Sequence, residues 1–528
     1  MTIRVGRVST AGIALALALT AGCSGASGAP KALAKAVLKV ATTANVTTWD
    51  PVKSFSTEVF YLANVYEPLL WKNPPGSAQP YTPALAESWE ASADKKTWTF
   101  HLRPGVTFHD GEPMNAAAVK ASIEAAKDHG GAAFIWAPLK EITTPDDKTV
   151  VMSLSYAAPM ELIASSMYGA WIVSPKALAA VKADEKYYES GKDGGTGAYT
   201  VAEYTSGQRV VLKKHAAYWG GWDKGQYATV VNTITPEAVV QQQMLTGGQV
   251  DIATSLPLEN IGRMRSDPKL SVIDCATASS YLGFFNTAKK PLDDPKVRRA
   301  LSYAIPYKEI IEVGAQGFGT QARGPVPAGV FPYSESTPQY VQDLGKAREL
   351  LADAGYADGG GLKLKLTYAA ENQSQKRFAP LIKDAFAKVG VTVDVQAILF
   401  NQQWEQAKAG PAKAQDIFLL LYWPTYSDAG SDNLWSLFHS SEKPFFNLSY
   451  WNDAKFDKLV EKAGTLTATD QARARAMYGQ AMSRLHEQAP GFFLYDVKAP
   501  LVAPKGITGL TCNPDYSFNI FFHRLAPA

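Results

Sequence analysis

Residues Leu362–Val395 read LKLKLTYAAENQSQKRFAPLIKDAFAKVGVTVDV and contain the pattern that decides the fold. The stretch starts with alternating apolar residues, continues with Phe378, Ile382 and Phe386 at helical spacing, and ends with a second alternating run after Gly390. Alternation is typical of strands, and the wider spacing is typical of a helix. A strand–helix–strand succession joins parallel strands. The sequence therefore predicts an α/β fold with a parallel sheet.

A second apolar run, DIFLLLYW at 416–423, fits a buried strand of the same sheet. It leads into YWPTYSDAG at 422–430, where three aromatic rings and a carboxylate surround a proline. Ligands of open α/β sheets bind beyond the carboxyl ends of the strands. We therefore predict that Tyr422, Trp423 and Tyr426 border a ligand cleft. The alternative is that Trp423 and Tyr426 cap the core of this part of the protein.

The length and composition indicate an ordinary globular protein of several domains. A chain of 528 residues is too long for one compact core, so we expect two or three domains. Apolar residues make up 46% of the chain and charged residues 19%, which is typical of a folded protein. The formal net charge is only +3, so composition gives no reason to expect a nucleic-acid partner.

The N-terminus has the layout of an export signal. Residues 1–22 hold two arginines and no acid, and the apolar run Ala11–Ala21 is too short to span a bilayer. Cys23 follows LTAG, which resembles the bacterial lipobox, although Thr20 stands where that motif usually has Leu. We expect residues 1–22 to be a signal peptide, Cys23 to be lipidated and 23–36 to be a flexible tether. An ordinary signal peptide is the alternative.

Two further cysteines, Cys275 and Cys512, remain after Cys23. Export implies an oxidising compartment, in which an even pair often forms a disulfide. Two separate buried thiols are the alternative, because the sequence does not show whether the residues are close in space.

Patterns of catalytic or metal-binding residues are missing from the sequence. There is no Gly-x-Ser-x-Gly motif and no phosphate loop, and the seven histidines are scattered. His101 and His109 are the closest pair, and neither belongs to a cluster with the spacing of metal ligands. A catalytic triad can be assembled from distant residues, so the prediction that the protein is not an enzyme and needs no cofactor or metal rests on a family resemblance and not on this absence.

The segment LAESWEASADKKTWTFHLRPGVTFHDGEPMNAAAVKASIE at 85–124 resembles the signature of the family-5 extracellular solute-binding proteins of ABC importers. The segments YEPLL, GTGAYTV with LKKHAAYWG, YLGFFNTAKKPLDDPKVRRALSYAI, LLADAGY and NLSYWNDAKFDKLVEKA resemble the same family in its order. The resemblance runs from about residue 38 to the C-terminus. Within the signature, glycines permit tight turns, and His109 beside Asp110 is more easily explained as structural than as catalytic.

This resemblance implies a periplasmic binding protein-like α/β fold, with two lobes, three domains and a ligand cleft between the lobes. A discontinuous first-lobe domain would comprise 37–70, 195–280 and 496–528, and an accessory domain of the same lobe would comprise 71–194. The second-lobe domain would comprise 281–495. Hinges would lie near Ser279–Phe285 and at about residue 495.

The resemblance also implies which residues contact the ligand. Phe55, Ser56 and Thr57 would face it from the first lobe. The segment 422–430 would face it from the second lobe, with Tyr422, Trp423, Thr425, Tyr426 and Asp428 as candidates, and Tyr281 is a further candidate near the hinge. Peptide binders of this family place an aspartate two or three residues after the tryptophan, where this chain has Pro424 or Thr425. Asp428 either turns into the cleft or braces the loop.

The function implied is that of a receptor that captures a small solute, an oligopeptide or a similar organic molecule, for an ABC permease and its ATPase. The receptor would be a monomer outside the cytoplasm, anchored to the membrane by lipid alone and without a nucleic-acid partner. Two alternatives stay open. One is a secreted glycosidase-like hydrolase that uses Asp428 with a second carboxylate, and the other is a receptor-fold lipoprotein that acts as a sensor or chaperone.

Overall fold

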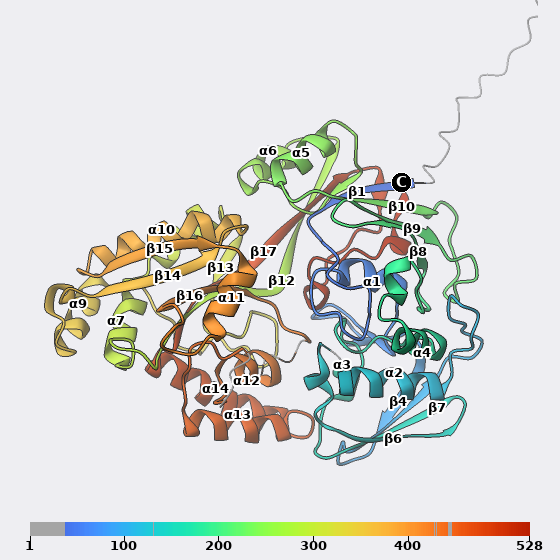
Figure 1. The fold of residues 1–528 in the computed structure, drawn as a ribbon, viewed down its shortest axis with the longest axis horizontal. Helices are drawn as coiled ribbons and strands as arrows, with labels where there is room; N and C mark the ends of the chain where they lie inside the picture. Colours follow the sequence, from blue (N-terminus) through green and yellow to red (C-terminus); the bar gives the residue numbers. More distant parts are fainter. Residues whose placement is uncertain (1–36, 130, 427, 429, 442–445) are drawn as a thin grey trace, which may run out of the picture. The chain divides into compact units, whose positions relative to one another are not determined.

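The computed structural model in Figure 1 describes residues 37–528 except 130, 427, 429 and 442–445. The predicted signal peptide, Cys23 and the tether lie outside the described residues. Within the described part, every helix is too short or too polar to cross a membrane.

One large sheet connects most of the molecule, in the strand order β15-β14-β16-β12-β17-β11-β1-β10-β9-β8, with β13 paired to β17. Its strands are β1 (Val37–Thr42), β8 (Tyr199–Thr205), β9 (Arg209–Lys214), β10 (Thr229–Ile234), β11 (Ile252–Ala253), β12 (Leu270–Phe285), β13 (Gly319–Gln321), β14 (Lys363–Ala369), β15 (Thr392–Ile398), β16 (Ile417–Tyr422) and β17 (Gly491–Pro504). We call residues 281–495 the second lobe and the other described residues the first lobe.

The predicted strand–helix–strand unit is present in the second lobe. Strands β14 and β15 are parallel, and helix α10 (Gln373–Ala387) connects them. Strand β16 is also parallel to β14, with Leu366 opposite Ile417. The apolar face of α10 supplies Phe378, Ile382 and Phe386 to the core, as its spacing predicts. The α/β fold class is therefore confirmed.

Helices complete the second lobe on both sides of this unit. Helix α7 (Pro295–Ala304) begins where Asp294 accepts a hydrogen bond from the Lys296 amide at 2.7 Å, as the Asp-Pro start predicts. The other long helices are α9 (Leu344–Asp353), α11 (Phe400–Lys408), α13 (Ala454–Leu466) and α14 (Gln471–Gln488).

The first lobe adds a small antiparallel sheet, in the order β4-β5-β7-β6, to its part of the large sheet. The strands are β4 (Ala86–Ala91), β5 (Thr97–Leu102), β6 (Leu139–Asp146) and β7 (Thr149–Leu154). The α-helices of this lobe are α1 (Val59–Val65), α2 (Ala116–His129), α3 (Met160–Ile163), α4 (Pro175–Ala183), α5 (Ala238–Thr246) and α6 (Ile261–Arg265). The chain before Val59 forms a turn, and helix α1 begins at Val59.

The motifs of the sequence resemblance meet in a buried polar cluster of the first lobe. Glu67 is 3% exposed and accepts hydrogen bonds from Trp219 Nε1 at 2.7 Å, Thr196 Oγ1 at 2.9 Å and the Tyr218 hydroxyl at 2.9 Å. Burial raises the pKa of Glu67 to about 6, although all three hydrogen bonds act against this rise. Glu67 belongs to YEPLL, Thr196 to GTGAYTV, and Tyr218 and Trp219 to LKKHAAYWG. These three motifs therefore stabilise the first lobe.

His109 has a structural role of the same kind. Its ring nitrogens lie 2.5 Å from Asp193 Oδ1 and 2.8 Å from the Gly197 carbonyl oxygen. Burial lowers the pKa of His109, but the Asp193 carboxylate outweighs burial, and the pKa is raised. Both ring nitrogens are engaged with the backbone or with Asp193, which explains the presence of His109 without any catalytic role.

Strands β12 and β17 pass side by side from one lobe to the other (Figure 1). Their antiparallel pairing runs from Leu270 opposite Pro504 to Phe284 opposite Gly491. The register shifts between Ala276 and Ser280, where residues 277–279 of β12 face Val497 of β17. A bulge of this kind weakens the ladder locally and bends the strand. A second register shift lies between Tyr281 and Leu282. The domain boundaries at 280 and 495 stay a prediction.

A disulfide connects Cys275, at the edge of this bulge, to Cys512 in the C-terminal segment. The two Cα atoms are 5.5 Å apart, and the two residues are 237 positions apart in the sequence. A cross-link over so long a loop removes much of the conformational freedom of the unfolded chain. The disulfide therefore ties the C-terminal segment at Cys512 to strand β12.

We predict that replacing both cysteines, Cys275→Ser with Cys512→Ser, destabilises the first lobe by about 2–5 kcal/mol. The measurement is thermal unfolding of the oxidised protein and of the double variant. Reductant should lower the melting temperature of the wild type and leave that of the variant unchanged. Equal melting temperatures for the two oxidised proteins would contradict the prediction.

Candidate functional site

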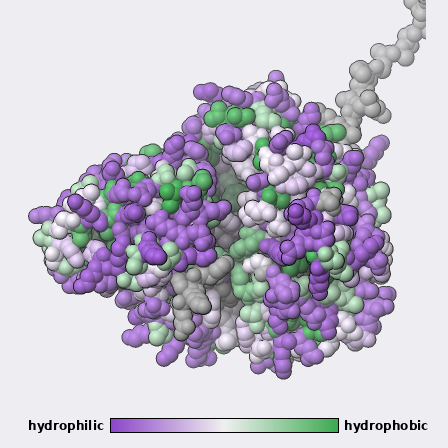
Figure 2. Space-filling view, in the orientation of Figure 1, coloured by the Kyte–Doolittle hydropathy of each residue, from purple (hydrophilic) through white to green (hydrophobic). Residues whose placement is uncertain are grey.

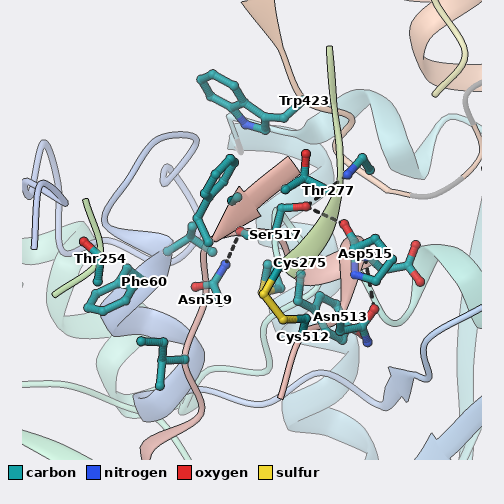
Figure 3. A pocket seen from close by; sticks show the side chains of 18 of the residues that line it. Phe60, Thr254, Cys275, Thr277, Trp423, Cys512, Asn513, Asp515, Ser517 and Asn519 are labelled. Carbon is teal, nitrogen blue, oxygen red and sulfur yellow. Dashed lines mark hydrogen bonds between the residues drawn. A yellow bond between two sulfur atoms is a disulfide. The ribbon is translucent and has the colours of Figure 1, made fainter. Parts of the chain in front are cut away.

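A cavity of about 330 Å³ lies where both lobes meet the crossing strands. Figure 2 shows the molecule hollowed on this face, and Figure 3 shows the cavity from close by. A volume of this size suits a small organic ligand. The lining residues are Thr42–Ala44, Ser56, Thr57, Val59, Phe60, Met167, Tyr168, Thr254, Cys275–Ala278, Leu421, Trp423, Pro424, Ala499–Leu501 and Thr511–Ile520.

The first-lobe wall includes Ser56 and Thr57, which precede helix α1. Glu58 is fully buried behind them and holds this turn. Its carboxylate accepts hydrogen bonds from Ser54 Oγ at 2.8 Å, the Ser56 amide at 3.0 Å and Thr47 Oγ1 at 2.8 Å. The charge of Glu58 is thus satisfied inside the lobe, while the backbone of the turn faces the cavity.

The second-lobe wall is formed by the end of strand β16. Leu421 and Trp423 line the cavity, and the Trp423 side chain, in a residue that is 36% exposed, lies beside the Tyr168 hydroxyl of the first lobe. Next to this contact, Ser166 Oγ donates a hydrogen bond to the Thr425 carbonyl oxygen at 2.9 Å. The two lobes therefore touch at the edge of the cavity.

The third wall is formed by the bulge in β12 and by the C-terminal segment. Thr277 Oγ1 donates to the Val497 carbonyl at 2.8 Å, which replaces a ladder bond lost at the bulge. The Ala278 amide donates to Ser517 Oγ at 3.1 Å, which ties the C-terminal segment to the bulge. The Cys275–Cys512 disulfide forms part of the same wall, and Trp423 lies across the cavity from it (Figure 3).

Three of the predicted ligand contacts, Ser56, Thr57 and Trp423, are brought together on this cavity. Phe55 lies next to them, with its ring 5.3 Å from that of Tyr168 and 6.3 Å from that of Phe446. Its side chain lies among these rings and is not part of the cavity wall.

Tyr422 and Thr425 are buried in the second lobe and do not line the cavity. The Tyr422 hydroxyl donates to Asp432 Oδ1 at 2.6 Å, and the Thr425 amide donates to Asp432 Oδ2. Burial raises the pKa of Asp432, and these donors act against the rise. The two residues and Asp432 form a buried brace under Trp423, so their placement differs from the predicted contact with a ligand.

The other three candidates also lie away from the cavity. Tyr281 is in the second-lobe core and donates from its hydroxyl to Asn372 Oδ1 at 3.0 Å. Tyr426 is half-buried and packs against the first-lobe core. Asp428 is 1% exposed, its Oδ1 accepts the Gly430 amide at 3.0 Å, and it lines a separate cavity of about 180 Å³ with Glu161. The placement of Asp428 fits the bracing alternative.

Sequence reasoning missed the C-terminal part of the wall and the residues Met167 and Tyr168. The segment TCNPDYSFN at 511–519 combines rings, amides and a carboxylate, much as YWPTYSDAG does. That similarity is the one local signal that could have found it. The bulge and the disulfide bring it to the cavity, and both depend on contacts between distant parts of the chain.

The charges around the cavity are already paired within the protein. Asp515 is the one charged residue among the described lining residues. Its Oδ1 lies 2.9 Å from Lys72 Nζ, with the two side chains only 4% and 21% exposed. Burial raises the pKa of Asp515, and the Lys72 ammonium acts against the rise. The cavity is thus lined by rings, hydroxyls, amides and aliphatic groups.

The model of the bacterial extracellular solute-binding proteins, family 5, matches residues 80–445. The chain belongs to this family. It is 31% identical over 431 residues to heme-binding protein A of Haemophilus influenzae, with 77% of each chain covered. It is 30% identical over 438 residues to the dipeptide-binding protein of Escherichia coli, covering 78% of this chain and 80% of that one.

The solved structure of the periplasmic binding protein DppA of Helicobacter pylori, in complex with the peptide STSA, has the same fold. Its TM-score is 0.80 at 24% identity, with 93% of this chain and 98% of that chain covered. The predicted family and the periplasmic binding protein fold are therefore confirmed. As a family-5 protein, the chain is a solute-binding receptor, and a cavity walled by both lobes is consistent with that role.

Asp496 is a buried carboxylate in strand β17, where this strand passes from one lobe of the family-5 protein to the other. Asp496 of β17 is 7% exposed and accepts hydrogen bonds from Ser280 Oγ at 2.7 Å and from the Ala328 amide at 3.0 Å. Burial raises its pKa from 3.8 to about 6, because these two donors compensate the lost hydration only in part. Between these pKa values the folded protein binds a proton that the unfolded chain does not.

We predict that raising the pH from about 4 to about 7 lowers the stability of the wild type more than that of Asp496→Asn, by roughly 1–3 kcal/mol. The sign follows because the folded protein binds the proton of Asp496 more tightly than the unfolded chain does. This preference stabilises the folded state at low pH and is lost when the pH rises above the folded pKa. The measurement is urea unfolding of both proteins at the two pH values. Parallel pH dependence in both proteins would show that Asp496 does not titrate in this range.

Proposed function

We propose that this protein is the extracytoplasmic receptor of an ABC importer, which captures a small organic solute between its lobes and delivers it to the permease. The observation that carries the proposal is that one cavity is walled by both lobes and by the strands that connect them. A ligand in this cavity would contact the first lobe, the second lobe and the strands β12 and β17 that connect them.

The mechanism proposed is closure about the crossing strands. Among the described residues, contacts between the lobes include the Ser166–Thr425 hydrogen bond, an ion pair of 2.9 Å between Arg377 and Glu259, and the ring contact of Phe55 with Phe446. Trp423 also lies beside Tyr168, and Tyr426 packs against the first-lobe core. Exposed ion pairs add little stability, about 0–1 kcal/mol. A solute that touches both lobes adds to these contacts only in the closed form, and so it shifts the population toward closure.

The finer parts of the proposal concern the setting of the receptor. We propose that Cys23 carries a lipid anchor, that the receptor works as a monomer, and that its domains are 37–70 with 195–280 and 496–528, 71–194, and 281–495. A permease and an ATPase would be the partners that accept the solute. Micromolar affinity, about −8 kcal/mol, would suit both capture and release.

Neither alternative function is favoured by a specific observation. A hydrolase would use Asp428 with a second carboxylate. Asp428 does share a cavity with Glu161, but that cavity is only about 180 Å³, Asp428 is 1% exposed, and the cavity is separate from the one that the connecting strands line. The relatives named above are binding proteins, which also speaks for a receptor. A sensor or chaperone with this fold would differ from an importer receptor only in its partners.

We predict that Trp423→Ala weakens solute binding about ten- to hundredfold, because the ring covers the ligand from the second lobe. The solute is first identified by native mass spectrometry of protein purified from its own host, and its affinity is then measured by calorimetry. An unchanged binding isotherm for Trp423→Ala would contradict the proposed site.

Trp435→Ala is the matched control for this experiment. Trp435 is 42% exposed on the same lobe, but its ring stacks on His439 at 4.0 Å and lies outside the cavity. We expect this variant to bind the solute with unchanged affinity, so that a loss seen only with Trp423→Ala reports on the cavity.

A further inference from the structure

We infer that the solute is uncharged: a molecule with a flat apolar face and hydroxyl or amide groups, rather than a free peptide, an amino acid or an anion. This inference rests on the proposed receptor function and specifies its substrate class. It is carried by the charges around the cavity, which are all engaged within the protein.

The cavity offers no partner for an anionic ligand. Among the described lining residues there is no lysine, arginine or histidine. The ammonium of Lys72, which lies outside the lining, is paired with Asp515 at 2.9 Å. A carboxylate or phosphate enclosed in this cavity would lose its hydration without gaining an opposite charge, which costs several kcal/mol. That cost would remove much of a micromolar affinity of about −8 kcal/mol.

The cavity is equally poor for a cationic ligand. The Asp515 carboxylate is the single acid in the described lining, and Lys72 neutralises it. Glu58 directs its carboxylate into the first lobe, where hydroxyls and amides saturate it. Asp432 is engaged in the same way by Tyr422 and Thr425 in the second lobe. An ammonium group in the cavity would therefore meet no free negative charge.

The lining does fit an uncharged ring-bearing molecule. Trp423 and Phe518, which are 36% and 54% exposed, line the cavity from the two lobes, and such aromatic surfaces pack against apolar faces of ligands. The side-chain oxygen of Asn519 accepts no hydrogen bond in the described structure, although its nitrogen donates to the Ser517 carbonyl at 3.2 Å (Figure 3). A buried acceptor without a donor is costly, so a ligand hydroxyl or amide N–H is the complementary group.

The test separates solutes by charge. An extract of the producing organism is divided by anion- and cation-exchange chromatography into anionic, cationic and neutral fractions. Each fraction is added to the full-chain protein, and its melting temperature is recorded. We expect the neutral fraction to raise the melting temperature by several degrees and the charged fractions to leave it unchanged. A rise caused by a charged fraction alone would overturn the inference while leaving the receptor function standing.

Two controls connect the result to this cavity. The rise caused by the neutral fraction should be reduced in Trp423→Ala and retained in Trp435→Ala, and the active compound is then isolated and its charge determined by electrophoresis. A rise retained in Trp423→Ala would overturn the assignment to this cavity. A complete lack of response to all three fractions would count against the receptor function itself.

Discussion

The pairing of β12 with β17 is the constraint on which the rest of the structure depends. Both strands belong to one sheet that enters both lobes, so the lobes share backbone hydrogen bonds and cannot separate as independent bodies. The ladder is interrupted in two places, where residues 277–279 face Val497 and between Tyr281 and Leu282. We expect any bending between the lobes to occur at these interruptions. Because Thr277 and Ala278 also line the cavity, a ligand would lie directly against the point of bending.

Several side chains near this point restrict how the strands can move. Thr277 bonds to the Val497 carbonyl, Ser280 bonds to Asp496, and the Cys275–Cys512 disulfide fixes the C-terminal segment on one side. The disulfide adds a covalent constraint within the first lobe alone, so it stiffens the cavity wall without tying the lobes together. The first lobe is thus stiffened by the disulfide, while the pairing of β12 with β17 is weakened at the bulge. This combination suits a receptor whose two lobes close by bending at a hinge.

The sequence predicted the local structure well, because strand and helix patterns depend on neighbouring residues. The unit β14–α10–β15 follows from such patterns, and so does the position of Trp423 at the end of a buried strand. Alternation along that strand also explains the misplaced candidate: Leu421 and Trp423 share one face, which lines the cavity, while Tyr422 points into the core. If this alternation of side chains is continued past the end of β16 to Trp423, Tyr422 and Trp423 fall on opposite faces. The sequence could in this way have excluded Tyr422 as a ligand contact.

The remainder of the site depends on contacts that no local pattern reports. Residues 511–520 reach the cavity through a disulfide and through the Ala278–Ser517 hydrogen bond, both of which join positions more than two hundred residues apart. The family motifs gave no help here, because Glu67 and His109 use their polar atoms to hold the first lobe together. Such motifs identify the frame, whereas the cavity is lined by residues outside them, in turns, in helix α1 and in strands β12 and β17.

The chemistry of the lining determines how such a frame can select a solute. With the carboxylates of Glu58, Asp432 and Asp515 engaged by the protein, none of these three groups is available to attract a charged solute. Selection must then come from contact: the fit of a ring against Trp423, the loss of water from apolar surface, and the satisfaction of buried acceptors such as Asn519 Oδ1. These interactions act only over short distances, so they favour the closed form only once both lobes are in contact with the solute. A neutral cavity is thus compatible with tight closure, and it couples recognition to bending at the interrupted ladder.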